Sequence, residues 1–239
     1  MDPVLVSEHG NLVHSGFVGL GVVLAGLVFA VQSRRAGPYD ERLLVVIAGT
    51  LVGGAVGMRA AGLVRYIDDV GSSVLADAWR YGAKSILGGL AGAYAGALVG
   101  KRLAGYDRPT GDLFAPALAL GMGIGRFGCF WTEPLGRMSS LPWSVRGMHP
   151  SFLYEIAFHL VAFVVLLALR GRLASPGALL TVYLAAYAGF RFLVEFTRAN
   201  EVLGLGLTGS QWFVLAASPL LVAKLRRTAL RPAPTAALA

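Results

Sequence analysis

Charged side chains are scarce in this sequence. Asp, Glu, Lys and Arg together make up 14% of its 239 residues, whereas 56% of the residues are hydrophobic. Because soluble domains carry about 25% charged residues, this composition excludes an ordinary soluble protein and indicates the lipid bilayer as the solvent. The formal net charge of +8 does not indicate nucleic-acid binding, since the basic residues form short clusters between apolar runs.

The sequence has a single cysteine and shows neither the pattern of a cleavable signal peptide nor an internal repeat. Cys129 is the only cysteine, which excludes an intrachain disulfide framework. The first apolar run follows Asp2, Glu8 and His9 instead of a basic region, so we expect no cleavable signal peptide. There is no internal repeat, and the tail over residues 232–239 is predicted to be disordered.

Long apolar runs are plentiful, and seven of them are long enough to span a bilayer as helices. They cover residues 12–31, 43–64, 84–104, 112–131, 151–170, 176–196 and 209–225. The third run contains GGLAGAYAG, which is typical of close helix packing in membranes. The sequence therefore predicts an all-α integral membrane protein with seven transmembrane helices. We expect a single domain over residues 1–231, with a periplasmic loop over 132–150.

The distribution of Lys and Arg predicts the orientation of these helices. Basic clusters flank the first, third and fifth loops and the C-terminal tail, which all lie on one side if seven helices alternate. Cytoplasmic loops are the ones enriched in Lys and Arg. We therefore expect the N-terminus outside and the C-terminus in the cytoplasm.

The stretch from Gly125 to Glu155 joins the fourth apolar run to the fifth and carries most of the unusual chemistry. Besides Glu155, it carries the charged side chains Arg126, Glu133, Arg137 and Arg146 and also His149. A charged group at membrane depth costs several kcal/mol, so it usually faces a protein interior or a wet cavity. This stretch is therefore the first candidate for a functional site.

A polar stripe runs along the sixth segment. Tyr187, Arg191, Glu195 and Arg198 follow one another at intervals of four, four and three, which places them on one face of a helix. Lipid cannot satisfy such a stripe, so we expect it to face a polar interior. An alternative is an Arg191–Glu195 ion pair that only orders the helices.

Arg126 is left without an obvious carboxylate in this interpretation, because Glu133 and Glu155 have other arginines as neighbours in the sequence. An unpaired arginine in an outer cavity suits a phosphate, which its planar fork holds with two parallel hydrogen bonds. A phospholipid head group is the expected ligand. The alternative is that Arg126 reaches the membrane interface and holds structural lipid. The glycines at 121, 123, 125 and 128 favour a re-entrant or broken helix here.

Several other side chains are candidates near this site. His149 lies just before the fifth helix and can act as a base or brace the loop. Tyr154 and Glu155, at the start of that helix, can brace the Arg126 region. His14 is near the outer end of the first helix and can point into the same cavity. Cys129 is interpreted as a small buried residue, since its neighbourhood is apolar and no histidine is adjacent in sequence.

The pattern resembles the prolipoprotein diacylglyceryl transferases of bacterial inner membranes. The similar residues are GRFGCF at 125–130, EPLGR at 133–137, LPW at 141–143, HPSFLYE at 149–155, the stripe from Tyr187 to Arg198, LTGSQ at 207–211 and, more weakly, SILGGLAG at 85–92. The resemblance implies a multi-pass enzyme of the bacterial inner membrane. It implies transfer of the diacylglyceryl group of phosphatidylglycerol to the lipobox cysteine of a prolipoprotein, with release of glycerol 1-phosphate.

The resemblance also implies roles for individual residues. Arg126 and Arg191 match the family's two essential arginines, and Glu133, Tyr187 and Glu195 join them as expected catalytic residues. Expected substrate-binding residues are Arg126, Arg191, Arg198, Gly136, Arg137, His149, Tyr154, Glu155, Cys129, Gly88 and Gly89. The expected partners are phosphatidylglycerol, the prolipoprotein signal-peptide lipobox and membrane lipids, with no nucleic acid, no cofactor and no metal.

Four positions depart from the family pattern. Leu87 stands where the family has a histidine in its His-Gly-Gly-Leu segment, Cys129 where it has an asparagine, Gly16 or Phe17 where it has a tyrosine, and Ser210 where it has a glycine. Two alternatives therefore accompany the transferase. One is an altered paralogue that binds phospholipid head groups without thiol transfer. The other is a small transporter, which would show pseudo-symmetric halves that the sequence lacks.

Overall fold

The computed structural model describes residues 8–38, 40–63, 85–173 and 175–228, and within them the chain is mainly helical. It divides into two compact units. The first combines Met1–Gly37 with Pro109–Ala239, and the second covers Pro38–Arg108. The prediction of one domain over 1–231 stays a prediction, and the tail at 232–239 and all of residues 64–84 lie outside the described residues.

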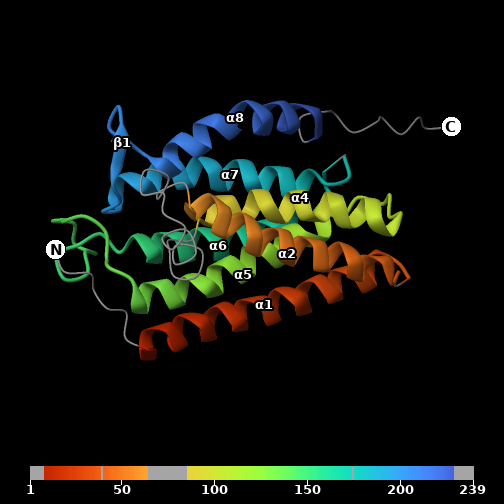
Figure 1. Ribbon diagram of the computed structural model, residues 1–239, viewed down its shortest axis with the longest axis horizontal. Coiled ribbons are helices and arrows are strands. Elements are labelled where there is room, and N and C mark those ends of the chain that lie inside the picture. Colours follow the sequence, from red (N-terminus) through yellow and green to blue (C-terminus); the bar gives the residue numbers. More distant parts are fainter. Residues whose placement is uncertain (1–7, 39, 64–84, 174, 229–239) are drawn as a thin grey trace, which may run out of the picture. The chain divides into compact units, whose positions relative to one another are not determined.

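The described residues of the first unit form five long helices and a short β-hairpin, which can be followed in Figure 1. The helices are α1 (Glu8–Ala36), α5 (Gly111–Thr132), α6 (Ser151–Leu169), α7 (Ala178–Val194) and α8 (Gly209–Thr228). After α7 come the 3-10 helix η2 (Glu195–Thr197) and the antiparallel strands β1 (Val202–Gly204) and β2 (Leu207–Thr208). The apolar core between α5, α6 and α7 contains Ala115, Ala119, Leu166, Leu179 and Tyr183.

The second unit is a pair of helices, α2 (Arg42–Leu63) and α4 (Ile86–Ala104). Their glycines face one another so closely that a Cβ at Gly92 would collide with the Gly53 carbonyl oxygen, and one at Gly96 with the Gly49 carbonyl oxygen. The predicted close packing of the GGLAGAYAG run is therefore confirmed, because only glycine permits this approach of two backbones.

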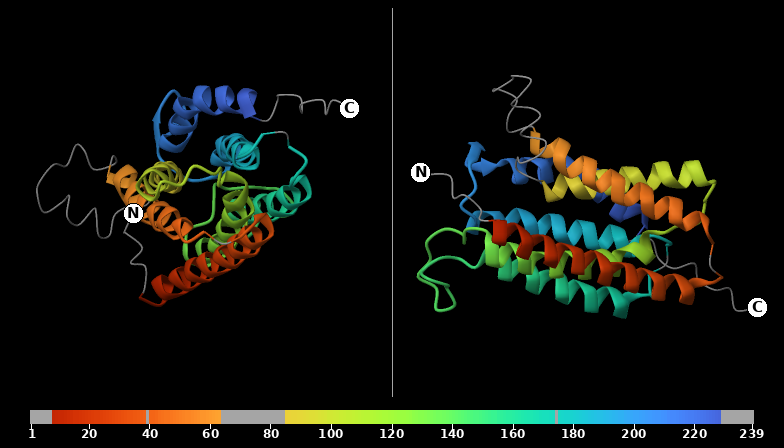
Figure 2. Two further views of the ribbon diagram at one scale, coloured as in Figure 1. Left: turned by 90° about the vertical axis from the view of Figure 1, so that its right-hand side faces the viewer. Right: turned by 60° about the horizontal axis from the view of Figure 1, so that its bottom comes forward.

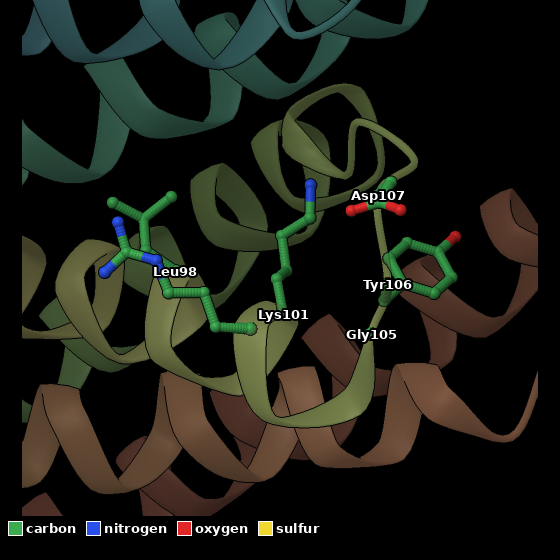
Figure 3. Close-up of a pocket in the computed structure, with 6 residues that line it drawn as sticks. Leu98, Lys101, Gly105, Tyr106 and Asp107 are labelled. Atoms are coloured by element: carbon green, nitrogen blue, oxygen red, sulfur yellow. The ribbon is translucent and has the colours of Figure 1, made fainter.

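The C-terminal end of α4 closes with an ordered turn. Gly105 ends the helix in the left-handed region at φ 58°, and its carbonyl accepts a hydrogen bond from Arg42 at 3.0 Å. Figure 3 shows the shallow pocket at this end, lined by Leu98, Lys101, Arg102, Gly105, Tyr106 and Asp107. Lys101 donates to the Arg108 carbonyl at 2.6 Å and lies over the Tyr106 ring, so its charge is already engaged within the turn.

All seven predicted segments coincide with helices, and the bounds differ by a few residues. Five of the described helical segments are long and apolar enough to cross a membrane: Leu12–Ala36, Arg42–Leu63, Gly111–Thr132, Ser151–Leu169 and Ala178–Thr197. The protein is therefore an all-helical membrane protein. The glycine-rich α4 and the basic-ended α8 are outside this set, so a count of seven spanning helices stays a prediction.

The expectation of a broken fourth helix is wrong. Helix α5 runs without interruption from Gly111 to Thr132. Its glycines serve close helix packing instead: a Cβ at Gly121 would lie 3.1 Å from the Gly21 carbonyl oxygen, and one at Gly128 would lie 3.1 Å from the His14 backbone. Figure 2 shows α1 lying alongside α5.

Candidate active site

The two predicted functional stretches meet at one end of the first unit. Figure 1 shows the 133–150 segment at the same end as the β-hairpin. The Arg137 amide donates to the Thr197 carbonyl at 2.8 Å, and the Arg137 Nε donates to the Arg198 carbonyl at 3.0 Å. The loop after α5 is therefore hydrogen-bonded to the segment after α7, which brings charged residues from α5, α6 and α7 together.

Five of these residues form an alternating chain of charges that we call the arginine cluster: Arg126, Glu155, Arg198, Glu195 and Arg191. Ion pairs join Arg126 to Glu155 and Arg191 to Glu195. Arg198 connects the two pairs, with its Nη1 2.9 Å from Glu155 Oε1 and its Nε 4.0 Å from Glu195 Oε2. All five side chains are at least 87% buried, so this is a charge network shielded from bulk water.

The expectation that Arg126 lacks a carboxylate is wrong. Glu155 supplies one from α6, and its side chain is fully buried. Sequence proximity misled the prediction, because Glu155 is 29 positions from Arg126 and reaches it only through the packing of α5 against α6. Arg191 does pair with Glu195 and also donates to Ser210 at 3.4 Å, whereas the alternative that this pair only orders the helices stays a prediction.

The cluster nevertheless holds an excess of positive charge. Three guanidiniums are matched by two buried carboxylates, and the next acid, Glu133, is 41% exposed and 4.0 Å from Arg198. Burial lowers the pKa of the Arg198 guanidinium, and Glu155 opposes that shift. A buried cation without full compensation favours the arrival of an anion.

Some buried polar atoms in and beside the arginine cluster have no hydrogen-bond partner among the described residues. Arg126 Nε, the Tyr187 hydroxyl and His159 Nε2 are buried there and have no hydrogen-bond partner in the described part of the chain. Tyr187 lies beside Arg126, and its ring centroid is 4.9 Å from that of His159. Buried polar atoms are usually paired, and Tyr187 and Arg126 are close enough to interact with each other, so these atoms do not by themselves indicate a ligand.

Glu195 is held by residues that sequence reasoning did not single out. Its Oε1 accepts hydrogen bonds from Asn200 at 2.7 Å and from Thr208 at 2.8 Å. The Thr208 amide donates in turn to Gln211 at 2.9 Å. Thr208 and Gln211 belong to the LTGSQ motif, which was the available signal, whereas Asn200 had none. The β-hairpin therefore fixes the carboxylate that neutralises Arg191.

Phe152 is a further residue that sequence reasoning did not single out, although it lies within the HPSFLYE motif. Its ring lies 4.5 Å from the Arg198 guanidinium carbon and 5.8 Å from that of Arg126. An aromatic face attracts a guanidinium, so Phe152 packs between the two arginines that share Glu155. Nothing in its type distinguishes it from the other apolar residues of α6.

Gly136 and Arg137 belong to the loop that closes this end. The Gly136 amide donates to the His149 carbonyl at 2.9 Å, and a Cβ at Gly136 would collide with the Thr197 carbonyl oxygen and the Ser151 hydroxyl. The loop acid Glu133 caps α5, with its amide donating to the Cys129 carbonyl at 2.8 Å. Glycine is therefore required at 136 by the close approach of two backbones.

His149 and Tyr154 form a separate group beside the loop. His149 Nδ1 lies 3.3 Å from the Tyr154 hydroxyl, which also accepts a hydrogen bond from Trp143 at 3.0 Å. Glu155 braces Arg126 as expected, whereas Tyr154 braces His149. His159 is fully buried and lies 3.0 Å from the Tyr183 hydroxyl, so it is a packed histidine of the bundle.

Gly88, Gly89 and Leu87 lie on α4, in the second unit. A Cβ at Gly88 would collide with the Ala61 side chain, and one at Gly89 would lie 3.4 Å from the Met58 side chain. Leu87 is buried. Helix packing accounts for these glycines, and their expected role in substrate binding stays a prediction.

Cys129 lies one turn beyond Arg126 and is buried, as predicted. Arg126 Nη1 donates to its sulfur at 3.7 Å, and His14 Nδ1 lies 3.9 Å from the same sulfur. Cys129, His14 and Glu133 place their ligand atoms within 4.8 Å of one another. The Cys129 thiol thus lies between Arg126 of the arginine cluster and His14. The sequence placed His14 near this site only through its position near the outer end of the first helix.

The sequence matches a family of known proteins. The family model described as Prolipoprotein diacylglyceryl transferase matches residues 7–225. Relatives named phosphatidylglycerol–prolipoprotein diacylglyceryl transferase include one from Chromohalobacter salexigens, 33% identical over 90% of this chain and 83% of the relative. Another, from Pseudomonas aeruginosa, is 31% identical over 97% of both chains.

The match to other relatives of that name is shorter. For the protein from Methylobacillus flagellatus, the identity is 38% over 133 residues, which are 48% of this chain and 51% of the relative. This chain thus spans about half the length of that relative. The match of 7–225 covers most of the sequence and includes every residue of the arginine cluster. The chain therefore belongs to the prolipoprotein diacylglyceryl transferase family of membrane enzymes.

Proposed function

We propose that this protein transfers the diacylglyceryl group of phosphatidylglycerol to the lipobox cysteine of prolipoproteins. The observation that carries the proposal is the arginine cluster, in which three buried guanidiniums share two buried carboxylates. The family match and the names of the relatives support a transferase over an altered paralogue that binds lipid without transfer.

The proposed reaction develops negative charge on a departing phosphate, and an excess of guanidinium charge can stabilise it. The cysteine sulfur attacks the glycerol carbon that bears the phosphate, a carbon–sulfur bond forms, and the carbon–oxygen bond to the phosphate breaks. The bonding electrons leave with glycerol 1-phosphate, and the thiol proton is transferred to a base or to solvent. Charge develops on the departing phosphate oxygen, and fixed donors aimed at that oxygen lower the barrier.

Arg126 and Arg191 are the residues to which we assign the phosphate. Arg126 Nε has no hydrogen-bond partner among the described residues, and the Tyr187 hydroxyl lies beside Arg126. Glu155 and Glu195 hold the two guanidiniums in place and prevent full charge repulsion between them. Glu133 is the most exposed acid of the group and is available to accept the thiol proton.

The remaining assignments concern substrate binding. Arg198 contributes the unmatched charge, Gly136 and Arg137 position the loop that covers the site, and His149 and Tyr154 lie at its outer edge. Cys129 forms part of the wall beside Arg126. We also propose that all seven long helices span the bacterial inner membrane, with the N-terminus outside, the C-terminus in the cytoplasm and the 132–150 loop periplasmic. The partners are then phosphatidylglycerol, prolipoprotein signal peptides and membrane lipids.

The proposal is tested with purified protein in mixed micelles of detergent and phosphatidylglycerol, to which a lipobox peptide is added. We expect a thioether-linked diacylglyceryl peptide by mass spectrometry. Arg126→Lys and Arg191→Lys should each reduce the transfer rate by about 10²–10³-fold, since a point charge does not replace a planar fork of donors. Arg172→Lys, at an exposed position, is the matched control and should keep the wild-type rate.

A complementation experiment in cells distinguishes a transferase from a paralogue that only binds lipid. Cells depleted of their own transferase are supplied with this chain or with its Leu87→His variant, and lipoprotein maturation is followed by gel shift. Rescue by the wild-type chain supports the transferase. Rescue by the variant alone, with phosphatidylglycerol still bound by the wild-type chain, would overturn it in favour of the paralogue.

A further inference from the structure

The β-hairpin between α7 and α8 has an exposed apolar end, which we call the hairpin tip and define as Val202, Leu203 and Leu205. The side chains of Leu205 and Leu203 are the most exposed of the three, at 88% and 67%. The six residues over 202–207 carry no charge. Apolar side chains that gather on a surface usually mark a contact with a partner or a membrane, so the hairpin tip is a candidate interaction surface.

The backbone at Leu205 points to the same conclusion. Leu205 has φ 49° and Gly206 has φ 75°, and together they form the two-residue turn between Gly204 and Leu207, which pair in the hairpin. A turn with two positive φ angles favours Asn-Gly or Asp-Gly, because the left-handed region is unfavourable for a side chain like that of leucine. Leucine is therefore favoured at 205 neither by the backbone nor by packing within the described protein.

The base of the hairpin is fixed at the end of a membrane span. Thr208, which pairs with Val202, donates to Glu195 at 2.8 Å, and Glu195 lies in the last turn of the apolar segment Ala178–Thr197. Leu205 is three residues beyond Val202, which is about 10 Å along a strand. The head-group region on each side of a bilayer is about 5–8 Å thick, so the hairpin begins at its depth.

The hairpin also runs in the direction that keeps its tip at that depth. Figures 1 and 2 show it crossing the ends of α7 and α8 instead of continuing along their axes. A Cβ at Gly209, the first residue of α8, would lie 3.2 Å from the Leu203 side chain. An element that crosses the end of a spanning helix lies along the membrane surface, and its exposed side chains then meet lipid.

The flanking helix ends have the composition of a membrane interface. Leu193 and Phe196 at the end of the α7 segment are exposed, as are Trp212 and Phe213 in the first turn of α8. Tryptophan is enriched where hydrocarbon meets head groups. Because residues 202–207 contain no Lys or Arg, the tip has no group to bind an anionic head group and suits the apolar part of the interface.

We propose that the hairpin tip inserts into the lipid leaflet at this end of α7, with Leu205 as its deepest side chain. A peptide paired along β1 would cover Val202 and Leu203 but leave the apex at Leu205 exposed, so lipid accounts for all three side chains. Insertion anchors the hairpin, whose base at Thr208 holds the carboxylate of Glu195. This inference does not depend on the proposed transferase activity.

The contact is measured with a fluorophore attached through Leu205→Cys, in nanodiscs of phosphatidylcholine and phosphatidylglycerol. Cys129 is the only native cysteine and is buried, so wild type labelled in the same way gives the background. We expect a nitroxide on the lipid acyl chains to quench the fluorophore at least about twofold, and aqueous iodide to quench it little, as for an apolar group below the head groups. Ser140→Cys, at an exposed polar position of the 133–150 segment, is the control and should show the opposite pattern.

The two quenchers also distinguish the other possible occupants. Strong iodide quenching at position 205 would place the tip in water and overturn the inference. Protection from both quenchers would indicate a protein contact, such as a second copy of the chain, and would overturn it as well. The same measurement through Leu203→Cys repeats the test if the first variant does not fold.

Leu205→Asn separates a lipid contact from a role in folding. Asparagine suits the positive φ of this turn, so the Tm should stay the same or rise. The fluorophore attached through Leu203→Cys should nevertheless lose at least about half of its quenching by the acyl-chain nitroxide, because the deepest apolar side chain is gone. Unchanged quenching, or a lower Tm that assigns Leu205 to the packing of the protein, would overturn the inference.

Discussion

Replacement of Glu155 by glutamine tests the charge balance of the arginine cluster most directly. Glu155 is fully buried and contacts two guanidiniums, those of Arg126 and Arg198. Gln keeps the size of the side chain but removes the charge, so the excess positive charge of the cluster rises from one to two. Breaking a buried ion pair by removal of one partner costs about 3–5 kcal/mol.

The expected result is a large loss of thermal stability. For a chain of this size, each kcal/mol corresponds to roughly 2–4 °C in Tm, so Glu155→Gln should lower the Tm by roughly 6–20 °C. Cys129 makes the assay simple, because it is the only cysteine and is buried. A thiol-reactive dye therefore reports the opening of the first unit in detergent solution.

A control and an anion titration separate charge from packing. Asp40→Asn removes an ion pair with Arg42, whose side chain is 54% exposed, and it should leave the Tm nearly unchanged. Added phosphate should raise the Tm of Glu155→Gln more than that of wild type, since the variant has more unmatched charge to bind it. A variant as stable as wild type, or one whose Tm does not respond to phosphate, would refute the conclusion that the arginine cluster carries an excess positive charge.

Three further predictions concern Tyr187 and the glycines. Tyr187→Phe should leave the free energy of unfolding within about 1 kcal/mol of the wild-type value, because removal of the hydroxyl loses at most its contact with Arg126. A drop in the transfer rate alone would then assign the hydroxyl to the substrate. Gly136→Ala should destabilise the loop by about 1–3 kcal/mol through overpacking and should increase proteolysis within 133–150. Gly92→Ala should lower the Tm, because its Cβ would collide with the Gly53 carbonyl. The control Gly189→Ala has open space and should be neutral or slightly stabilising; equal effects at both positions would contradict the packing argument.

Helix positions could be predicted from the sequence because they depend on local properties. An apolar run of sufficient length forms a helix in a bilayer whatever surrounds it, so the predicted bounds agree with α1, α2 and α4 to α8 to within a few residues. The intervals of four and three residues between Tyr187 and Arg198 predicted that the polar stripe lies on one helix face. The burial of these four side chains agrees with that prediction.

Partners across helices could not be predicted in the same way. The sequence left Arg126 without a carboxylate, because the identity of its partner depends on how α5 and α6 are rotated against each other, and spacing does not encode that rotation. The same limit hid the cluster of His14, Cys129 and Glu133. Glycines were misread for a related reason: they permit either a break or a close approach, and only the neighbouring helix decides which.

The loop after α5 has a structural part in the site beyond covering it. Arg137 binds the Thr197 carbonyl through its amide and the Arg198 carbonyl through its side chain, and these are the backbone positions that carry the bridging guanidinium of the cluster. Gly136 allows this contact because no Cβ separates the two backbones. The position of Arg198 therefore depends on the loop, and a change in loop conformation alters the distance from Arg198 to Glu155 and Glu195 together.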